Sequence, residues 1–163
     1  MATFIMLPDG QTGTNNWLQK GFTMTICTYD HVDVDDDNGD YCKESTANHE
    51  ITFTMADPSI AESAIGSIDS VQVKTKMSYT AGSTASTYVR TDLQGGGVTH
   101  NQDQHTVAGG STYAEYNGDV ETTRDGTNPW EYTHLEGLEV QFKKILSAAA
   151  RTEVRLSYFY VEV

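Results

Sequence analysis

The stretch that decides the fold spans residues 67–79 and reads Ser-Ile-Asp-Ser-Val-Gln-Val-Lys-Thr-Lys-Met-Ser-Tyr. From Val71 onward every second residue is uncharged and mostly apolar, while Gln72, Lys74 and Lys76 take the positions between. Successive side chains of a β-strand point to opposite faces. The alternation therefore predicts a strand with one face on a core and the other in water.

Strand patterns recur along the rest of the chain, separated by connections rich in Gly, Asn, Asp, Ser and Thr. The segments that show them are 22–29, 50–55, 86–93, 113–117, 120–123, 138–146 and 151–163. Only residues 60–65 and 133–138 have helical character, for one or two turns each. The sequence therefore predicts an all-β fold, an antiparallel jelly-roll-like β-sandwich of about eight strands with one or two short helical turns.

The chain of 163 residues fits one domain, and it shows no internal repeat and no linker between domains. We assign residues 17–163 to the sandwich. Residues 1–16 differ, because a short apolar strand at 3–7 is followed by a turn and a Thr- and Asn-rich link. This segment is interpreted as either a first strand of the sandwich or an arm that docks elsewhere.

The composition is strongly acidic, since ten Lys and Arg residues against 23 Asp and Glu residues give a net charge of −13. Nucleic acid repels such a chain, because duplex DNA carries one negative charge per about 1.7 Å of its axis. No run approaches the roughly 18 apolar residues that a spanning helix requires, and the start has no signal-peptide pattern. We expect no nucleic-acid partner, no membrane association, and synthesis in a cytoplasm.

The two cysteines are Cys27 and Cys42. A single pair in a cytoplasmic product is more often two free thiols than a disulfide, so free thiols are the favoured prediction. If the pair is bridged, the closed loop of roughly 15 residues contributes about 3 kcal/mol in the chain-entropy model.

An acidic turn is the strongest local signal for a ligand. Asp33, Asp35 and Asp37 have the alternate spacing of a calcium loop, and Glu44 falls where an EF-hand places its closing bidentate carboxylate. The glycine, Gly39, is not at the sixth position of such a loop, and neither flank is helical. We favour a solvated acidic turn and keep Ca²⁺ bound by these four carboxylates as the alternative, with no other cofactor expected.

No catalytic pattern stands out. The chain has no Gly-x-Ser-x-Gly elbow, no phosphate-binding glycine loop and no His-Glu-x-x-His motif, so we predict that it is not an enzyme. A pair of carboxylates for glycoside hydrolysis is kept as an alternative only because acidic residues are plentiful. His100 and His105 lie in what we interpret as a long polar connection, residues 93–111, which favours a surface location for both.

The aromatic residues number sixteen, nine of them Tyr. Exposed Tyr and Trp on a sandwich can stack on sugar rings, but aromatic rings also supply the largest buried area in cores and interfaces, and packing is the favoured interpretation. The last strand carries Tyr158, Phe159, Tyr160 and Val161 in succession, so both of its faces look apolar. These four residues are therefore predicted to form a subunit interface as well as part of the core.

Several features in this order resemble the small jelly-roll decoration, or cement, proteins of tailed-phage capsids. They are Trp17 before a strand, the acidic turn ending in Asp-Tyr (35–41), Ile-x-x-Val-x-Val (68–73) followed by Lys74 and Lys76, Asn-Pro-Trp (128–130), and the ending Tyr-x-Tyr-Val-Glu-Val (158–163). The resemblance covers roughly residues 17–163. The last two features carry most of it.

The resemblance implies a viral structural protein without catalysis. Such proteins form homotrimers on the outer capsid surface of the virion and clamp adjacent subunits of the major capsid protein after the shell expands. Clamping stabilises the shell by mass action, because the clamp binds the assembled form and not its parts. The predicted capsid contacts are Thr3, Phe4, Ile5, Met6, Leu7 and Pro8, together with loops at one end of the sandwich.

A second hypothesis comes from a different class of function. Related sandwiches occur on virion fibres and tails, where a carbohydrate- or receptor-binding module recognises the host surface. Tight, selective binding on a glycan array would favour this module, and its absence would leave the decoration protein.

Overall fold

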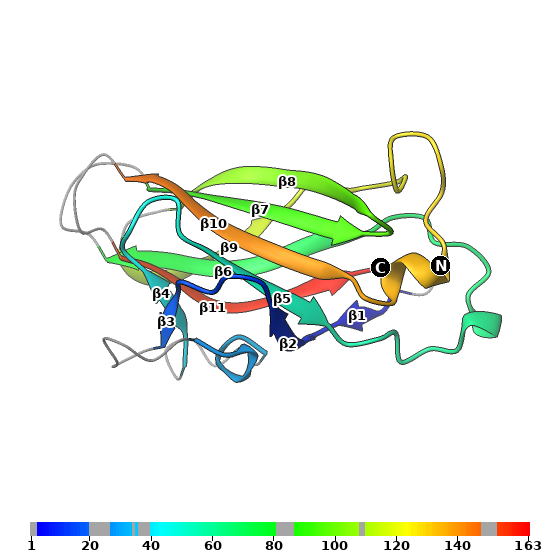
Figure 1. Ribbon diagram of the computed structural model, residues 1–163, viewed down its shortest axis with the longest axis horizontal. Helices are drawn as coiled ribbons and strands as arrows, with labels where there is room; N and C mark the ends of the chain where they lie inside the picture. Colours follow the sequence, from blue (N-terminus) through cyan, green and yellow to red (C-terminus); the bar gives the residue numbers. More distant parts are fainter. Residues whose placement is uncertain are drawn as a thin grey trace.

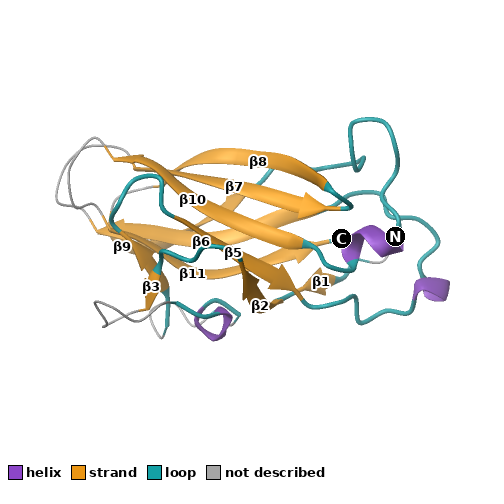
Figure 2. Ribbon diagram, viewed as in Figure 1, coloured by secondary structure: helices purple, strands orange, loops and turns teal. Residues whose placement is uncertain are grey.

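The computed structural model describes residues 3–19, 27–33, 35, 40–80, 87–107, 110–147 and 153–163, and every structural statement below concerns these residues. Two β-sheets pack face to face, and all of their strand pairs are antiparallel (Figure 1, Figure 2). The chain is therefore an all-β sandwich, as the sequence predicts.

Sheet A has six strands in the order β3-β4-β11-β6-β9, with β1 also pairing with β11. Its strands are β1 (Ile5–Met6), β3 (Leu18–Gln19), β4 (Cys42–Glu44), β6 (Gln72–Thr80), β9 (Gly110–Asn117) and β11 (Glu153–Glu162). Sheet B has five strands in the order β2-β5-β10-β7-β8. Its strands are β2 (Pro8–Thr12), β5 (Glu50–Met55), β7 (Thr87–Gly95), β8 (Val98–Val107) and β10 (Glu139–Ser147).

The eight strands from β4 to β11 form a jelly roll. Along the chain they visit sheets A, B, A, B, B, A, B and A, so that each sheet interleaves strands from the two halves of the chain. This interleaving is the double Greek key of the jelly roll. The expected eight-strand fold is confirmed, and the shorter strands β1, β2 and β3 are added at its edges.

The core is centred on three phenylalanines that meet between the sheets. Phe53 of β5 and Phe142 of β10 come from sheet B, and Phe159 of β11 comes from sheet A. Their ring centroids lie 4.9 to 6.2 Å apart in tilted or edge-on pairs, and all three side chains are fully buried. This aromatic contact links side chains of the two sheets across the core.

The N-terminal residues belong to the sandwich and are not a detached arm. Met6 pairs with Val161 in sheet A, and two residues later Pro8 begins the strand that pairs with β5 in sheet B. Met6 and Pro8 are both buried. The segment crosses from one sheet to the other, so it closes the sandwich and does not offer all of residues 3–8 to a partner.

The predicted polar connection at 93–111 is wrong. Residues 98–107 form β8, which pairs with β7 through a tight turn at Gly96 and Gly97, both in the left-handed backbone region. His100 and His105 are buried in this strand, and the His105 ring packs on Tyr116 at 5.6 Å between centroids. Burial lowers the pKa of His105 below its ordinary value, although nearby Asp103 and Asp119 act in the opposite direction.

Other strand boundaries in the structure differ from the predicted ones by a few residues. The strand expected at 67–79 begins at Gln72, because Ile68 and Val71 form isolated bridges to Trp130 and Glu121 instead. Residues 120–123 contribute only the second of these bridges. Most of the strand expected at 22–29 falls outside the described residues.

Within the described ranges, helical structure is limited to α1 (Tyr132–Leu135) and the 3₁₀ turns η1 (Tyr29–His31) and η2 (Glu62–Ala64). The two helical turns expected from the sequence therefore overlap α1 and η2. Among the described residues, no helix has the length and apolar character needed to cross a bilayer.

The prediction of free thiols is wrong, because Cys27 and Cys42 form a disulfide with their Cα atoms 5.4 Å apart. Cys42 lies in β4, and Cys27 is held beside it by a hydrogen bond from its backbone N–H to the carbonyl of Trp17. Both sulfur-bearing side chains are fully buried. The bond ties the connection between β3 and β4 to the edge of sheet A.

Candidate binding groove on sheet A

A β-bulge in the last strand decides which side chains face outward from sheet A. Leu156 pairs with Met77 and Tyr158 pairs with Lys76, so Ser157 is an extra residue with no partner on β6. The extra residue reverses the alternation. Leu156 and Phe159 consequently both point into the core, while Tyr158 and Tyr160 both point outward.

Two parallel rows of outward side chains follow from the strand register. The first row is Tyr158 on β11, Lys76 on β6 and Glu115 on β9. The second row, two residues along each strand, is Tyr160, Lys74 and Asn117. Each row therefore runs from an aromatic ring across a cation to a polar acceptor, and the rows lie side by side on one face.

These rows line a groove with a volume of about 360 Å³. The two tyrosine rings are 5.5 Å apart between centroids and inclined by 40°, so they form a continuous aromatic wall. Ile5 of β1, which is 49% exposed, lies at the same groove, and Asp35 reaches it from the acidic turn. The volume lies within the range of small-ligand sites, and the lining is more polar than in most of them, since only Ile5 and the two tyrosines are apolar or aromatic.

Each lysine of the groove has a carboxylate beside it. Lys76 Nζ lies 2.7 Å from Asp35 Oδ1, and Lys74 Nζ lies 4.0 Å from Glu162 Oε1. Burial raises the pKa of Tyr158, and the nearby Tyr160, Asp35 and Asp33 act in the same direction. Burial, with Glu162 and Glu115, likewise raises the pKa of Tyr160. Both phenols therefore keep their protons at neutral pH and can donate a hydrogen bond.

The next row along the strands is packed rather than open. Arg155 pairs with Ser78, and its guanidinium lies 4.9 Å from the ring centroid of Tyr41. Its Nε also donates a 2.9 Å hydrogen bond to Glu153. Ser78 and Tyr41 are buried under this cluster, so the outer face is filled here and the groove is confined to the two rows described above.

The predicted interface residues 158–161 separate into two groups. Phe159 and Val161 are fully buried core residues, so they cannot contact a second subunit. Tyr158 and Tyr160 are half-buried and remain available on the outer face. In a regular alternation this strand would have apolar residues on both faces. The bulge at Ser157, which the sequence pattern does not reveal, instead places Phe159 and Val161 in the core and turns the two tyrosines toward the groove.

The described members of the predicted calcium set do not converge. Glu44 pairs with the buried Val154 and so faces the core, where its carboxylate accepts hydrogen bonds from the backbone N–H groups of Ser45 and Thr46. Asp35 lies on the opposite face of sheet A with Lys76.

Asp37 lies outside the described residues. Asp33 is described, but it belongs to no cluster of possible metal ligands among the described residues. Within the described ranges no three His, Cys, Asp or Glu side chains gather as a metal site. Among the described members of the set, Glu44 and Asp35 therefore lie apart, because the strand β4 turns Glu44 away from the acidic turn.

Only some of the residues that line this groove were singled out from the sequence. Tyr158, Tyr160 and Ile5 were singled out for other reasons, whereas Glu115 and Asn117 were not singled out at all. The signal that could have found them is the period of two in β6, because the outward positions Lys74 and Lys76 must be flanked by outward residues of the neighbouring strands. Finding those neighbours requires the strand order, which the sequence does not state.

No family model and no curated protein matches the sequence. Among solved structures, the chain is similar to the CBM22-1 xylan-binding domain of Xyn10C from Paenibacillus barcinonensis. The TM-score is 0.44 and the identity is 12%, over 98% of this chain and 91% of that one.

Proposed function

We propose that this chain is a non-catalytic β-sandwich module that binds a neutral carbohydrate chain in the groove of sheet A. The observation that carries the proposal is the pair of outward tyrosines, 5.5 Å apart, beside two rows of hydrogen-bonding side chains.

The chemistry of a sugar ring suits the groove. A pyranose presents apolar C–H groups on its face and hydroxyl groups around its edge. The Tyr158 and Tyr160 rings offer flat apolar surfaces for the face. The ammonium groups of Lys74 and Lys76 donate to hydroxyl oxygens, while Glu115 and Asn117 accept from hydroxyl protons, Asn117 also being able to donate. The register sets these groups in two adjacent rows, which suits consecutive sugar units.

The charges around the groove favour a neutral glycan over an acidic one. Each lysine of the groove already has a carboxylate near it, Asp35 for Lys76 and Glu162 for Lys74. Glu115 adds a further negative charge. An anionic sugar would have to compete with these carboxylates in a protein that carries a net charge of −13. A neutral sugar needs only to share the existing donors and acceptors.

Replacing both tyrosines with alanine (Tyr158→Ala and Tyr160→Ala) is expected to weaken glycan binding at least about ten-fold, which corresponds to about 1.4 kcal/mol. The loss follows because the apolar stacking surface is removed while the polar rows remain. The glycan is first identified on an array of neutral and acidic oligosaccharides, and the affinities are then measured by isothermal titration calorimetry.

The matched control is Tyr88→Ala, which removes a half-buried tyrosine that faces outward from β7 in the other sheet. This variant should bind the glycan as the native protein does. Binding that survives the double replacement, or an array on which no neutral glycan is retained, would contradict the proposal.

Capsid decoration is the second candidate function. The observation that favours it is the net charge of −13, which suits a protein on the outside of a shell filled with DNA. Under this hypothesis the chain is a homotrimer bound to the major capsid protein of a virion. Because residues 5–6 and 8–12 form strands of the sandwich, the contact surface would be an exposed face and not a free arm.

Co-sedimentation with expanded phage heads tests this candidate. A decoration protein is expected to pellet with the heads at a stoichiometry close to that of the major capsid protein, and to have a trimeric mass in solution. Retention on the heads without glycan binding would favour decoration. Glycan binding by a monomer that stays in the supernatant would favour the carbohydrate module.

A further inference from the structure

The aromatic wall of the groove on sheet A runs along β11. Tyr158 and Tyr160 are both outward residues of this strand, and Lys76 and Lys74 lie beside them on β6 in the same order. A ligand that covers both rings, whose centroids are 5.5 Å apart, therefore extends parallel to the strands. The two ends of its path are set by the next outward side chains in each direction.

One end of this path is filled. Beyond Tyr158 and Lys76 the next outward pair is Arg155 and Ser78. Ser78 lies on the same face of β6 as Lys76, yet it is only 1% exposed. Neighbouring side chains therefore rise above Ser78 and occupy the space into which the groove would otherwise continue.

The side chains at the filled end hold one another in place. The Arg155 guanidinium lies 4.9 Å from the ring centroid of the buried Tyr41. Glu153 accepts a 2.9 Å hydrogen bond from Arg155 Nε and lies 3.6 Å from Lys43 Nζ on β4. Burial raises the pKa of the Tyr113 phenol on β9, and the charges of Arg155 and Tyr41 act on it from nearby. We call these five residues the end cluster, and none of them lines the groove.

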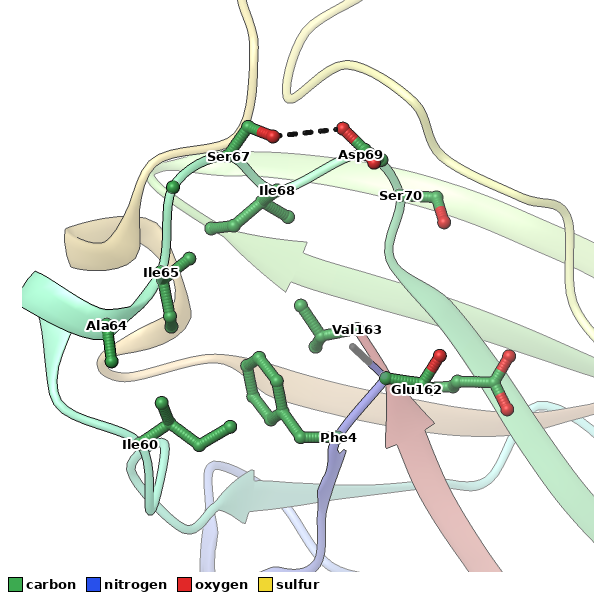
Figure 3. A pocket seen from close by; sticks show the side chains of 12 residues that line it. Phe4, Ile60, Ala64, Ile65, Ser67, Ile68, Asp69, Ser70, Glu162 and Val163 are labelled. Atoms are coloured by element: carbon green, nitrogen blue, oxygen red, sulfur yellow. Dashed lines mark hydrogen bonds between the residues drawn. The ribbon is translucent and has the colours of Figure 1, made fainter. Parts of the chain in front are cut away.

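The opposite end of the path is open. Beyond Tyr160 and Lys74 the next residue of β11 on this face is Glu162, whose side chain is 40% exposed and whose carboxylate lies 4.0 Å from Lys74 Nζ. Figure 3 shows Glu162 at the margin of a second hollow, of about 380 Å³, and its side chain points away from Phe4 and Val163. A chain that leaves the groove past Tyr160 therefore meets open space and not a packed row.

We propose that the groove binds the end of a glycan chain and not its interior, an inference that rests on the proposed carbohydrate function. The terminal sugar unit lies beside Tyr158 against the end cluster, and the next unit lies beside Tyr160. The remainder of the chain leaves past Glu162, where it adds few contacts. The interior of a polysaccharide would have to continue past Tyr158 as well, and Arg155 with its neighbours fills that path.

The dependence of affinity on ligand length is the first measurement. Cello-, xylo-, manno- and malto-oligosaccharides, from the monosaccharide to the hexasaccharide, are titrated into the full chain by calorimetry. In the series that binds, affinity should rise up to the disaccharide or trisaccharide and then stay constant, because further units contact solvent. An affinity that still rises at the hexasaccharide would overturn end recognition and leave carbohydrate binding intact. Binding of no series, together with an empty glycan array, would contradict the proposed function itself and this inference with it.

The stoichiometry on a long soluble chain of the same series separates the end from the interior. Each linear chain has a single end of the kind that is recognised. We therefore expect one protein molecule per chain, whatever the chain length. Several protein molecules bound along one chain would overturn the proposal.

The variant Arg155→Ala assigns the effect to the end cluster, because it removes the side chain that lies over Tyr41. In this variant the hexasaccharide should bind at least about three-fold more tightly than the trisaccharide, whereas the native protein binds both equally. The matched control is Lys143→Ala, which removes a cation paired with Glu50 at 3.3 Å on the other sheet and should keep the native dependence on length. An unchanged length dependence in Arg155→Ala, or the same change in the control, would overturn the role of the end cluster.

Discussion

Phe159→Ala is expected to lower the free energy of unfolding by about 3–5 kcal/mol, the range observed when a fully buried phenylalanine is truncated. Phe159 is the contribution of sheet A to the central aromatic contact, with Phe53 at 5.0 Å and Phe142 at 4.9 Å between ring centroids. Truncation leaves a cavity bordered by two rings whose positions are fixed by their own strands. Since a domain is stable by only about 5–15 kcal/mol, this single change should remove a large part of the total.

The measurement is chemical denaturation followed by tryptophan fluorescence and circular dichroism. Tyr160→Ala is the matched control, because Tyr160 is the next residue of the same strand and faces the groove. It should cost less than about 1 kcal/mol of stability, since it removes a half-buried side chain and leaves no closed cavity. Similar losses for the two variants would show that the bulge at Ser157 does not divide the strand into core and groove positions.

The comparison of Phe159 and Tyr160 also shows what the sequence could predict. The fold class and six of the eight jelly-roll strands, among them the clearest interior strand, followed from the period of two in the chain, whereas β4 and β8 were not predicted as strands. That period is strong wherever one face of a strand is buried and the other is wet, as in β6. It fails at a bulge, because one extra residue exchanges the two faces without changing the composition of the strand.

The β8 strand shows a second limit. Residues 98–107 are rich in Thr, Asn, Gln, Asp and His, which is the composition of a connection, and they follow the glycine-rich residues 95–97. The segment is nevertheless a strand, because backbone pairing with β7 over its whole length outweighs the weak propensity of its side chains. Burial of His100 and His105 is then a consequence of the tertiary structure that no local pattern indicates.

The candidate groove could be predicted only in part for a related reason. Tyr158 and Tyr160 are conspicuous in the sequence, but their function depends on Lys74, Lys76 and Glu115, which come from other strands. Strand order brings these residues together, and the jelly roll pairs β11 with β6 although they are more than 70 residues apart. Local periodicity can supply the outward residues of each strand, but it cannot select which strands are neighbours.

Opening the disulfide between Cys27 and Cys42 is expected to lower the free energy of unfolding by about 3 kcal/mol. The bond closes a loop with a sequence separation of 15, and the chain-entropy model gives this cost for a loop of that length. The loop includes the acidic turn, and its closure holds Val32 against β11, where the Val32 carbonyl accepts a 3.3 Å hydrogen bond from the N–H of Phe159. For a domain of this size the midpoint of thermal unfolding should fall by roughly 6–12 °C.

Unfolding of the oxidised protein and of the protein treated with dithiothreitol should therefore differ by this amount. The double variant Cys27→Ala with Cys42→Ala is the control, and dithiothreitol should leave its midpoint unchanged. Two thiols that react with Ellman's reagent in the air-oxidised, denatured protein would instead support the free-thiol prediction from the sequence. If the chain is made in a reducing cytoplasm, as we expect, the bond closes only after release into an oxidising medium. Freshly synthesised protein should then resemble the reduced form, and its stability should rise on exposure to air.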